Sequence, residues 1–147
     1  SLSLPLILRH EFNYQKIIPT FIIETLRGNP IPIYGDGEQR SEYIYVGDVV
    51  ESFVRALNSE KNLSGEIIHV GQGKSYSVNE IIDALEKVWN KKIQRNYQKM
   101  RPGEIKLGIS LKPEKMTELL DYKLQWDLEK GLKDTIPYYE EIFKQIN

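Results

Sequence analysis

The sequence predicts a mixed α/β fold in a single domain spanning residues 1–147. Apolar residues recur at helical spacing in some segments and form short β-rich runs in others, and the two patterns alternate along the chain. Hydrophobic residues make up 40% and charged residues 28%, as in an ordinary globular domain. A chain of this length buries about 68–70% of its unfolded surface, so a sizeable core is expected.

The first third of the chain predicts strand, helix and strand. Leu6–Arg9 is typical of a short buried strand. The helix that follows ends at Gly28–Pro30, because glycine and proline stop helices. Ile31–Tyr34 is the next strand, and Pro32 places it at a sheet edge because proline lacks the N–H that a ladder needs. The apolar residues of the helix are Ile17, Ile18, Phe21, Ile22 and Leu26.

The middle third predicts two further strands, each followed by a helix. Tyr43–Val46 is β-rich, and Asp48 is expected to cap a helix. Glu66–Val70 predicts another strand after a polar loop. Ser77–Glu80 has the form of a capping box at the start of the next helix. The apolar residues of the two helices are Val49, Val50, Phe53, Val54 and Leu57, then Val78, Ile81, Ile82, Leu85 and Trp89.

The last third is predicted to be mainly helical. Ile93–Tyr97 alternates weakly and indicates a strand. A short helix is expected over Pro113–Leu120, with proline at its start. Asp127 is expected to cap a final helix that runs toward Ile146, and Pro137 is expected to kink or split it.

Composition excludes several classes of function. The 20 basic and 21 acidic residues nearly cancel, which removes the electrostatic argument for a nucleic-acid partner. Without cysteine there is no disulfide, thiolate zinc site or thiol nucleophile, and His10 and His69 are too distant in sequence for a local metal motif. No apolar run approaches the ~20 residues that span a bilayer, and no signal peptide is recognised. A cytoplasmic protein without a membrane partner is expected.

The glycines do not form a nucleotide loop. Gly73–Ser75 resembles the end of a P-loop, but the first glycine of that motif would fall on Ile68. A dinucleotide fingerprint fails in the same way, because its last glycine would fall on Arg40 or on Tyr76. We therefore expect no cofactor to be bound by this chain alone.

A complete catalytic set is also missing. None of the nine tyrosines has lysine four residues later, so the Tyr-x-x-x-Lys pair, in which lysine lowers the pKa of a tyrosine base, does not occur. The single carboxylates Asp36, Glu42 and Asp48 are expected to be solvated or capping groups. No catalytic residue and no metal ligand is predicted.

Two segments carry a resemblance to a known family. Asn29 to Gln39 reads NPIPIYGDGEQ, and Tyr43 to Val49 reads YIYVGDV. Together they resemble the "G-x-P-x-x-I-Y-G-D-G-x-Q-x-R-D-F-x-Y-V-x-D-V" pattern of the extended short-chain dehydrogenase/reductase family, which includes nucleotide-sugar epimerases and dehydratases. Further matches follow in the same order, at Gly65–Gly71, Arg101–Glu104, Lys115–Tyr122 and Leu128–Leu132.

The resemblance covers almost the whole chain but only the C-terminal part of that family. It implies an N-terminal Rossmann domain that carries both the NAD loop and the Tyr-x-x-x-Lys pair, neither of which is present in this sequence. It therefore implies a small α/β substrate-binding lobe without its Rossmann domain. NAD is then a cofactor of the full-length parent, and the missing domain or a second copy of the chain is an expected partner.

The resemblance also implies substrate-binding residues. Arg101 matches the arginine on the substrate diphosphate, a role that suits the guanidinium fork. Glu104 matches an acidic position that accepts from a ribose hydroxyl. Pro32 and Tyr34 fall on the strand that lines the nucleobase pocket, and Tyr43 matches a neighbouring aromatic. Each residue also has an alternative without a binding role. For Arg101 and Glu104 it is a solvated position in a loop, and for Pro32, Tyr34 and Tyr43 it is packing in the core or at a sheet edge.

Two positions depart from the family pattern. The arginine of "Q-x-R-D" falls on Ser41, whereas Arg40 lies one residue earlier and points to the opposite side of an extended segment. A bulge would let Arg40 reach a phosphate; otherwise one diphosphate contact is lost. Asn13 is the counterpart of the asparagine in a segment of the family that is otherwise poorly matched.

The implied function is the binding of a UDP- or dTDP-linked sugar within an NAD-dependent nucleotide-sugar epimerase similar to UDP-glucose 4-epimerase. The same lobe of a 4,6-dehydratase is the first alternative. A non-catalytic binding module from a truncated gene is the second.

Overall fold

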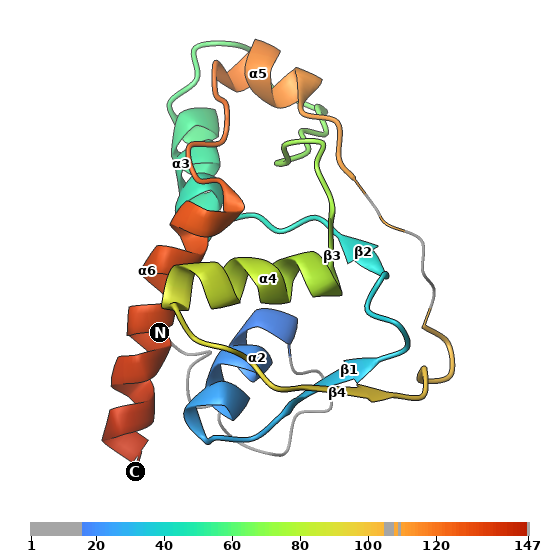
Figure 1. Ribbon diagram of the computed structural model, residues 1–147. Helices are drawn as coiled ribbons and strands as arrows, with labels where there is room; N and C mark the ends of the chain where they lie inside the picture. The colour runs from blue at the N-terminus through green and yellow to red at the C-terminus, as the bar shows by residue number, and fades with distance from the viewer. Residues whose placement is uncertain (1–15, 105–107, 109, 147) are drawn as a thin grey trace.

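The computed structural model describes residues 16–104, 108 and 110–146, and these residues confirm the mixed α/β class (Figure 1). The strand expected at Leu6–Arg9 and the site residue Asn13 lie outside the described residues. In chain order the elements are α2 (Ile17–Leu26), β1 (Ile31–Tyr34), β2 (Arg40–Ser41), α3 (Val46–Leu57), β3 (Tyr76–Ser77), α4 (Val78–Trp89), β4 (Arg95–Gln98), α5 (Glu114–Leu120) and α6 (Leu128–Ile146).

The strands form two small sheets. β1 and β4 run parallel, with Ile31 opposite Arg95, and β2 and β3 run antiparallel, with Arg40 opposite Ser77. The backbone N–H of Ile31 donates to the Gln94 carbonyl at 2.8 Å, so the backbone polar groups of the odd-numbered residues of β1 point toward β4. The Pro32 nitrogen points away from β4, and proline therefore costs the sheet no hydrogen bond.

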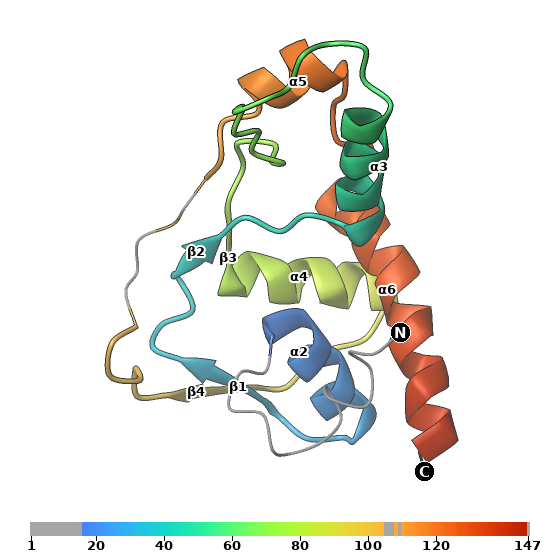
Figure 2. The same ribbon diagram turned by 180° about the vertical axis from the view of Figure 1, so that it is seen from behind.

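The main core lies between β1 and three helices. α4 packs against α6, and α2 packs against both α6 and β1, as both views of the ribbon show (Figures 1 and 2). The helical spacing of apolar residues in α2 and α4 is the reason, because it gives each helix one buried stripe. The fully buried members are Ile22, Ile31, Ile33, Ile81, Ile82 and Leu85.

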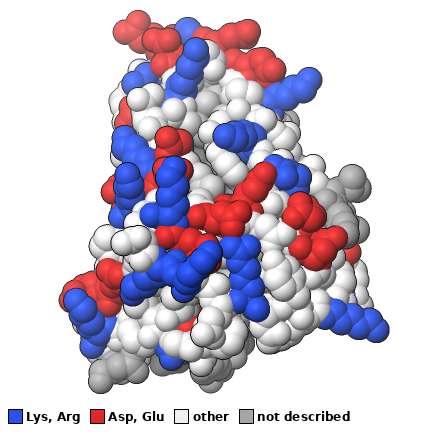
Figure 3. Space-filling view, viewed as in Figure 1, with Lys and Arg blue, Asp and Glu red and all other residues white. Residues whose placement is uncertain are grey.

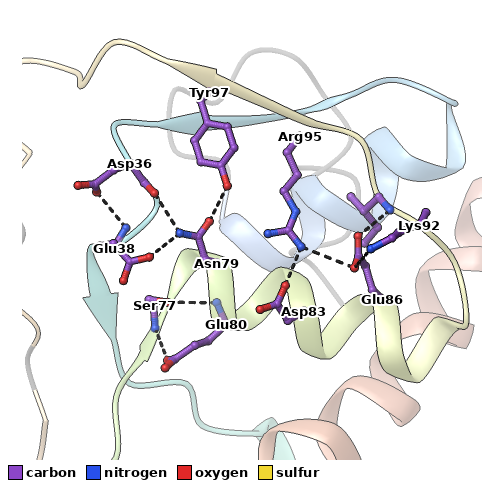
Figure 4. A network of polar contacts seen from close by, with 11 residues as sticks. Asp36, Glu38, Ser77, Asn79, Glu80, Asp83, Glu86, Lys92, Arg95 and Tyr97 are labelled. Atoms are coloured by element: carbon purple, nitrogen blue, oxygen red, sulfur yellow. Dashed lines mark hydrogen bonds and ion pairs between the residues drawn. The ribbon is translucent and has the colours of Figure 1, made fainter.

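Polar contacts fix α4 against β4 (Figure 4). The capping box is confirmed: the Ser77 hydroxyl accepts from the Glu80 N–H at 3.1 Å, and the Glu80 carboxylate accepts from the Ser77 N–H at 2.8 Å. One helical turn further on, Arg95 of β4 pairs with Asp83 at 2.6 Å. Glu86 accepts from the Ile93 N–H, and this hydrogen bond is the main reason that the pKa of Glu86 is lowered. The weakly alternating strand is thus held along the whole of α4.

A second, smaller cluster forms where α3 and α5 meet. Met116, Leu120 and Tyr122 are buried in it, and Ala56 of α3 packs against them. Ile68 and Val70, from the connection between α3 and β3, cover another side of the cluster. α5 begins at Glu114 directly after Pro113, as the sequence predicts.

Asp48 connects α3 to the segment that leads into α6. Its side chain is 0% exposed. Its carboxylate accepts from the Tyr122 hydroxyl at 2.5 Å and from the backbone N–H groups of Gln125 and Trp126 at 2.7 and 3.1 Å. Burial, followed by the hydrogen bond to Asp48, raises the pKa of Tyr122. The expectation of a helix cap at Asp48 was wrong, since α3 begins at Val46 and Asp48 lies in its first turn.

The apolar stripe expected in α3 does not face a core. Phe53 and Leu57 are 66% and 84% exposed, and Val50 and Val54 are exposed as well. Asp48, Ser52 and Ala56 form the inward side of the helix instead. The buried hydrogen bonds of Asp48 decide this orientation. Burying a carboxylate without hydrogen-bond partners costs more free energy than leaving an apolar side chain exposed to water.

Two predicted strands are wrong, and so is the split that was one of the two alternatives for Pro137. Tyr43–Val46 and Glu66–Val70 form no strand in the described part of the chain, and Val46 is instead the first residue of α3. A high β-propensity needs a neighbouring strand before a ladder can form. Pro137 does not split the last helix, which runs from Leu128 to Ile146. The N–H of Lys130 donates to the Asp127 side chain at 2.8 Å, which confirms the predicted cap.

Basic and acidic side chains are interspersed across the face seen in Figure 3, in keeping with the near-zero net charge. Among the described residues, no helix has the length and apolarity needed to cross a bilayer. The same residues contain no group of three or more His, Cys, Asp or Glu side chains that could hold a metal ion.

We expect Asp48→Ala to lower the free energy of unfolding by about 3 kcal/mol, because it leaves a buried hydroxyl and two N–H groups without their acceptor. Urea denaturation followed by circular dichroism measures this loss. Asp127→Ala is the matched control, because it removes one exposed helix cap and should cost about 1 kcal/mol. Equal losses in the two variants would contradict the role of Asp48.

Candidate functional site

The parallel pairing of β1 and β4 brings three of the predicted site residues together. Tyr34 is the last residue of β1, and the loop after β4 carries Arg101 and Glu104. Parallel strands end at the same edge of a sheet, so the residues that follow them are neighbours. The backbone confirms this, since the N–H of Gly35 donates to the Gln98 carbonyl at 2.8 Å.

Arg101 lies over the face of the Tyr34 ring, with the guanidinium carbon 4.2 Å from the ring centroid. Its Nε donates to Glu104 Oε1 at 3.0 Å, and one terminal nitrogen donates to the same oxygen. The Arg101 side chain remains 56% exposed. Glu104 Oε2 is buried and has no hydrogen-bond partner among the described residues. A flat ring, a planar cation and a carboxylate therefore form one cluster, which we call the Tyr34–Arg101 site.

The turn after β1 holds Tyr34 in place. The Gln39 side chain donates to the Tyr34 carbonyl at 2.9 Å, and its own Oε1 is buried without a partner in the described ranges. Gly35 has a φ of +82°, and a Cβ there would lie 2.6 Å from the terminal carbon of Met100. The left-handed backbone favours glycine here, whereas the flexible end of Met100 could move away from a Cβ. Sequence reasoning missed Gln39 as a positioning residue, although the residue stands inside the matched GDG-x-Q pattern.

Of two further predicted residues, Pro32 lies beside the site and Tyr43 lies away from it. Pro32 is partly buried on the same side of β1 as Tyr34, because alternate residues share a face. Tyr43 packs against the main core, and burial raises the pKa of its hydroxyl. No described contact joins Tyr43 to Arg101.

Arg40 is engaged elsewhere. It lies in β2 and donates to the Ser75 carbonyl at 2.9 Å, the Ser75 hydroxyl at 3.2 Å and the Glu80 carboxylate at 2.9 Å. It borders an open hollow of about 490 Å³ between β3, α4 and α6, which Arg101 does not line. Arg40 and Arg101 therefore lie in different parts of the fold and share none of their described hydrogen-bond partners.

Glu42, which the sequence predicted to be a solvated or capping group, accepts hydrogen bonds from three backbone N–H groups of two distant segments. Its Oε1 accepts from the N–H groups of Gln72 and Gly73 at 2.6 and 3.0 Å, and its Oε2 accepts from Leu111 at 2.7 Å. A Cβ on Gly71 would lie 2.9 Å from the Leu111 Cβ, so the segments approach closely. The signal was missed because all of these partners lie far from Glu42 in sequence.

The geometry suits binding rather than bond making. A guanidinium fork matches the oxygens of a phosphate, and an aromatic wall beside it takes a flat ring. The described residues bring no paired acid and base, and no activated nucleophile, to the Tyr34–Arg101 site.

Comparison with known proteins identifies related enzymes. Residues 5–71 match the model of the NAD dependent epimerase/dehydratase family. The UDP-N-acetyl-alpha-D-glucosaminuronate decarboxylase of Bacillus cytotoxicus is 31% identical over 134 residues, which are 88% of this chain and 41% of that protein. A putative UDP-glucose 4-epimerase of Methanocaldococcus jannaschii is 33% identical over 121 residues, covering 82% of this chain and 37% of that protein. Nucleotide-sugar dehydratases are among the relatives too.

A solved structure shares the fold. The UDP-glucuronic acid 4-epimerase of Bacillus cereus, in complex with UDP-glucuronic acid and NAD, superposes with a TM-score of 0.79 at 31% identity. The match covers 86% of this chain and 40% of that enzyme. The chain thus spans about 40% of the length of the relatives that it matches.

The Tyr34–Arg101 site should contribute little to stability, because exposed cation–π contacts and ion pairs are individually weak. We expect Arg101→Ala and Tyr34→Leu each to change the free energy of unfolding by less than about 1 kcal/mol. Glu42→Ala should lower it by about 2 kcal/mol, because three backbone N–H groups lose their acceptor. Urea denaturation of the three variants measures the difference. A loss in Arg101→Ala as large as that in Glu42→Ala would show that Arg101 is structural.

Proposed function

We propose that this chain supplies the nucleotide-diphosphate-sugar-binding part of an NAD-dependent nucleotide-sugar epimerase. The observation that carries the proposal is the Tyr34–Arg101 site at the ends of β1 and β4. The related enzymes, which act on nucleotide sugars, support the substrate class.

The unused capacity of Arg101 supports a diphosphate ligand. Its hydrogen bonds to Glu104 use Nε and one terminal nitrogen, and the other terminal nitrogen, Nη1, has no partner among the described residues. A diphosphate is a suitable acceptor, because charge-assisted, bidentate hydrogen bonds are the strong ones. The Tyr34 ring and Pro32 would then offer an apolar wall to the base, and the unpaired oxygen of Glu104 would accept from a ribose hydroxyl.

The residues of this chain do not fit NAD. A dinucleotide loop needs glycines between a strand and the start of a helix. The turn at Gly35 and Gly37 leads from β1 into β2 instead, and Gly71 is packed against Leu111 and Glu42. We therefore assign the cofactor to a part of the parent enzyme outside this chain, and we place this chain on the C-terminal side of that part. The lack of a Tyr-x-x-x-Lys pair supports the same assignment.

Binding of the substrate is common to the alternative reactions. A 4,6-dehydratase, like an epimerase, must hold a nucleotide diphosphate while its cofactor reacts at the sugar. The residues that decide between these reactions belong to the acid and base set that this chain lacks. The wording "W-x-Y-V-x-D-H", common in dehydratases, is not found in this sequence, which favours the epimerase.

We expect UDP-glucuronic acid to bind the isolated chain weakly, and Arg101→Ala to weaken the binding at least about tenfold, or 1.4 kcal/mol. Isothermal titration calorimetry measures both affinities, and a dTDP-sugar in parallel tests selectivity for the base. Arg40→Ala is the matched control, because Arg40 is committed to Ser75 and Glu80 and should not affect affinity. Equal isotherms for wild type and Arg101→Ala would remove Arg101 from the site.

The isolated chain should not interconvert nucleotide sugars when NAD is supplied, because the residues that hold the cofactor and move the proton are absent from it. Chromatographic separation of UDP-glucose and UDP-galactose after prolonged incubation tests this expectation. Turnover that persists after repeated purification would overturn the assignment of catalysis to another part of the parent.

A further inference from the structure

The side chain of Asn79, in the first turn of α4, bridges the two segments that carry the Tyr34–Arg101 site (Figure 4). Its Nδ2 donates to the Asp36 carbonyl at 3.0 Å and to Glu38 Oε1 at 2.6 Å, in the turn after β1 (residues 35–39). Its Oδ1 accepts from the hydroxyl of Tyr97, in β4, at 2.8 Å. The amide therefore uses both of its donor hydrogens on the turn and an acceptor site on β4.

The turn after β1 is shaped to receive this side chain. Gly37 has a φ of +77°, and a Cβ there would lie 2.7 Å from the Cγ of Asn79. A larger residue at this position would adopt a strained backbone and displace the Asn79 side chain from the turn. The backbone makes the same connection, because the N–H groups of Val78 and Asn79 donate to the carbonyls of Gln39 and Gly37 at 3.2 and 3.1 Å. Helix start and turn are thus joined through backbone and side chain together.

Both ends of this bridge lead directly to the site. Tyr34 immediately precedes the turn, and Gln39 at the far end of the turn donates to the Tyr34 carbonyl at 2.9 Å. Tyr97 lies in the strand that leads to Arg101. A movement of the turn relative to β4 would therefore change the spacing between the Tyr34 ring and the Arg101 guanidinium. Their own contact is too weak to prevent it, because a cation–π contact at an exposed site is worth only about 0.5–1 kcal/mol.

We propose that Asn79 is a positioning residue for the binding of the nucleotide sugar. By joining the turn after β1 to β4, it holds the Tyr34 ring and the Arg101 guanidinium at the spacing that the ligand requires. This inference rests on the proposed function, which assigns the diphosphate to Arg101 and the base to Tyr34. A ligand that contacts two groups whose spacing is already set loses less conformational entropy than one that must order them on binding.

We expect Asn79→Ala to weaken the binding of UDP-glucuronic acid about fivefold, because the turn and β4 lose their shared partner. Isothermal titration calorimetry on the whole chain measures the affinity. Asp83→Ala is the matched control, since Asp83 lies one helical turn further along α4 and pairs with Arg95 of β4 at 2.6 Å, without a described contact to the turn. The control should keep the affinity of wild type. Wild-type affinity in Asn79→Ala, or an equal loss in both variants, would overturn the proposal.

A spectroscopic measurement separates positioning from stability. Protons held over the face of an aromatic ring are shielded, so the side-chain resonances of Arg101 report its place over the Tyr34 ring. Tyr34→Leu supplies the unshielded reference in a nuclear magnetic resonance spectrum without ligand. Asn79→Ala should move these resonances toward that reference, and Asp83→Ala should leave them unchanged. Resonances that Asn79→Ala does not move would show that Asn79 has no positioning role, whatever its effect on Tm.

Tyr97→Phe tests the bridge from its other end. It removes a hydroxyl from a side chain that is 50% exposed and leaves the ring in place, so the chain should remain folded. The affinity should fall about threefold. The double variant Asn79→Ala with Tyr97→Phe should bind no more weakly than Asn79→Ala alone, because both changes remove the same hydrogen bond. Losses that multiply in the double variant would mean that the two residues act separately, against the proposal.

The proposed function is judged by different variants. Wild type that does not bind UDP-glucuronic acid, or binding that Arg101→Ala leaves unchanged, would overturn the proposed function and with it the role of Asn79. Binding that requires Arg101 and is indifferent to Asn79→Ala and Tyr97→Phe would overturn the positioning role alone.

Discussion

A carboxylate buried beside α5 requires hydrogen bonds from its neighbours, and Asp48 receives them from Tyr122, Gln125 and Trp126. This requirement turns the polar side of α3 inward and ties the helix to the segment that precedes α6. The apolar side of α3 is left outside as a consequence. One buried carboxylate thus determines where the second cluster forms and which side of α3 is left exposed.

The Tyr34–Arg101 site depends on a different constraint. The parallel pairing of β1 with β4 places the ends of both strands together, and the contacts between α4 and β4 keep that pairing in register. Gly35 and Gln39 then fix the turn that carries Tyr34. Because none of these contacts involves α3, the Tyr34–Arg101 site and the exposed side of α3 are held by separate parts of the chain.

Local patterns in the sequence predicted much of the fold. The capping box at Ser77–Glu80, the cap at Asp127 and the apolar stripes of α2 and α4 are all encoded within a few neighbouring residues. Asp48 and Glu42 were misread because their partners lie 30 to 78 residues away along the chain. Glu66–Val70 was misread because a strand is defined by a neighbour that the described residues do not provide.

The candidate site was predicted only in part, because some of its contacts join segments that are distant in sequence. The resemblance to nucleotide-sugar enzymes singled out Tyr34, Arg101 and Glu104, which the structure brings together. It could not indicate that Arg40 would be taken up by Ser75 and Glu80, because that arrangement requires β2 to pair with β3. Periodicity identifies the faces of elements, whereas polar partners across the fold follow only from the tertiary arrangement.

The two hydrophobic clusters differ greatly in size, which bears on how the molecule fluctuates. The larger one joins β1 with α2, α4 and α6, while the smaller one consists of three buried residues and a few partly covered neighbours. Cooperative units with few buried contacts open at lower free energy than the rest of a protein. The α3–α5 part should therefore exchange its amide hydrogens through partial opening while the β1–β4 pair stays closed. The Tyr34–Arg101 site would then remain formed in a molecule whose α3–α5 part is transiently unfolded.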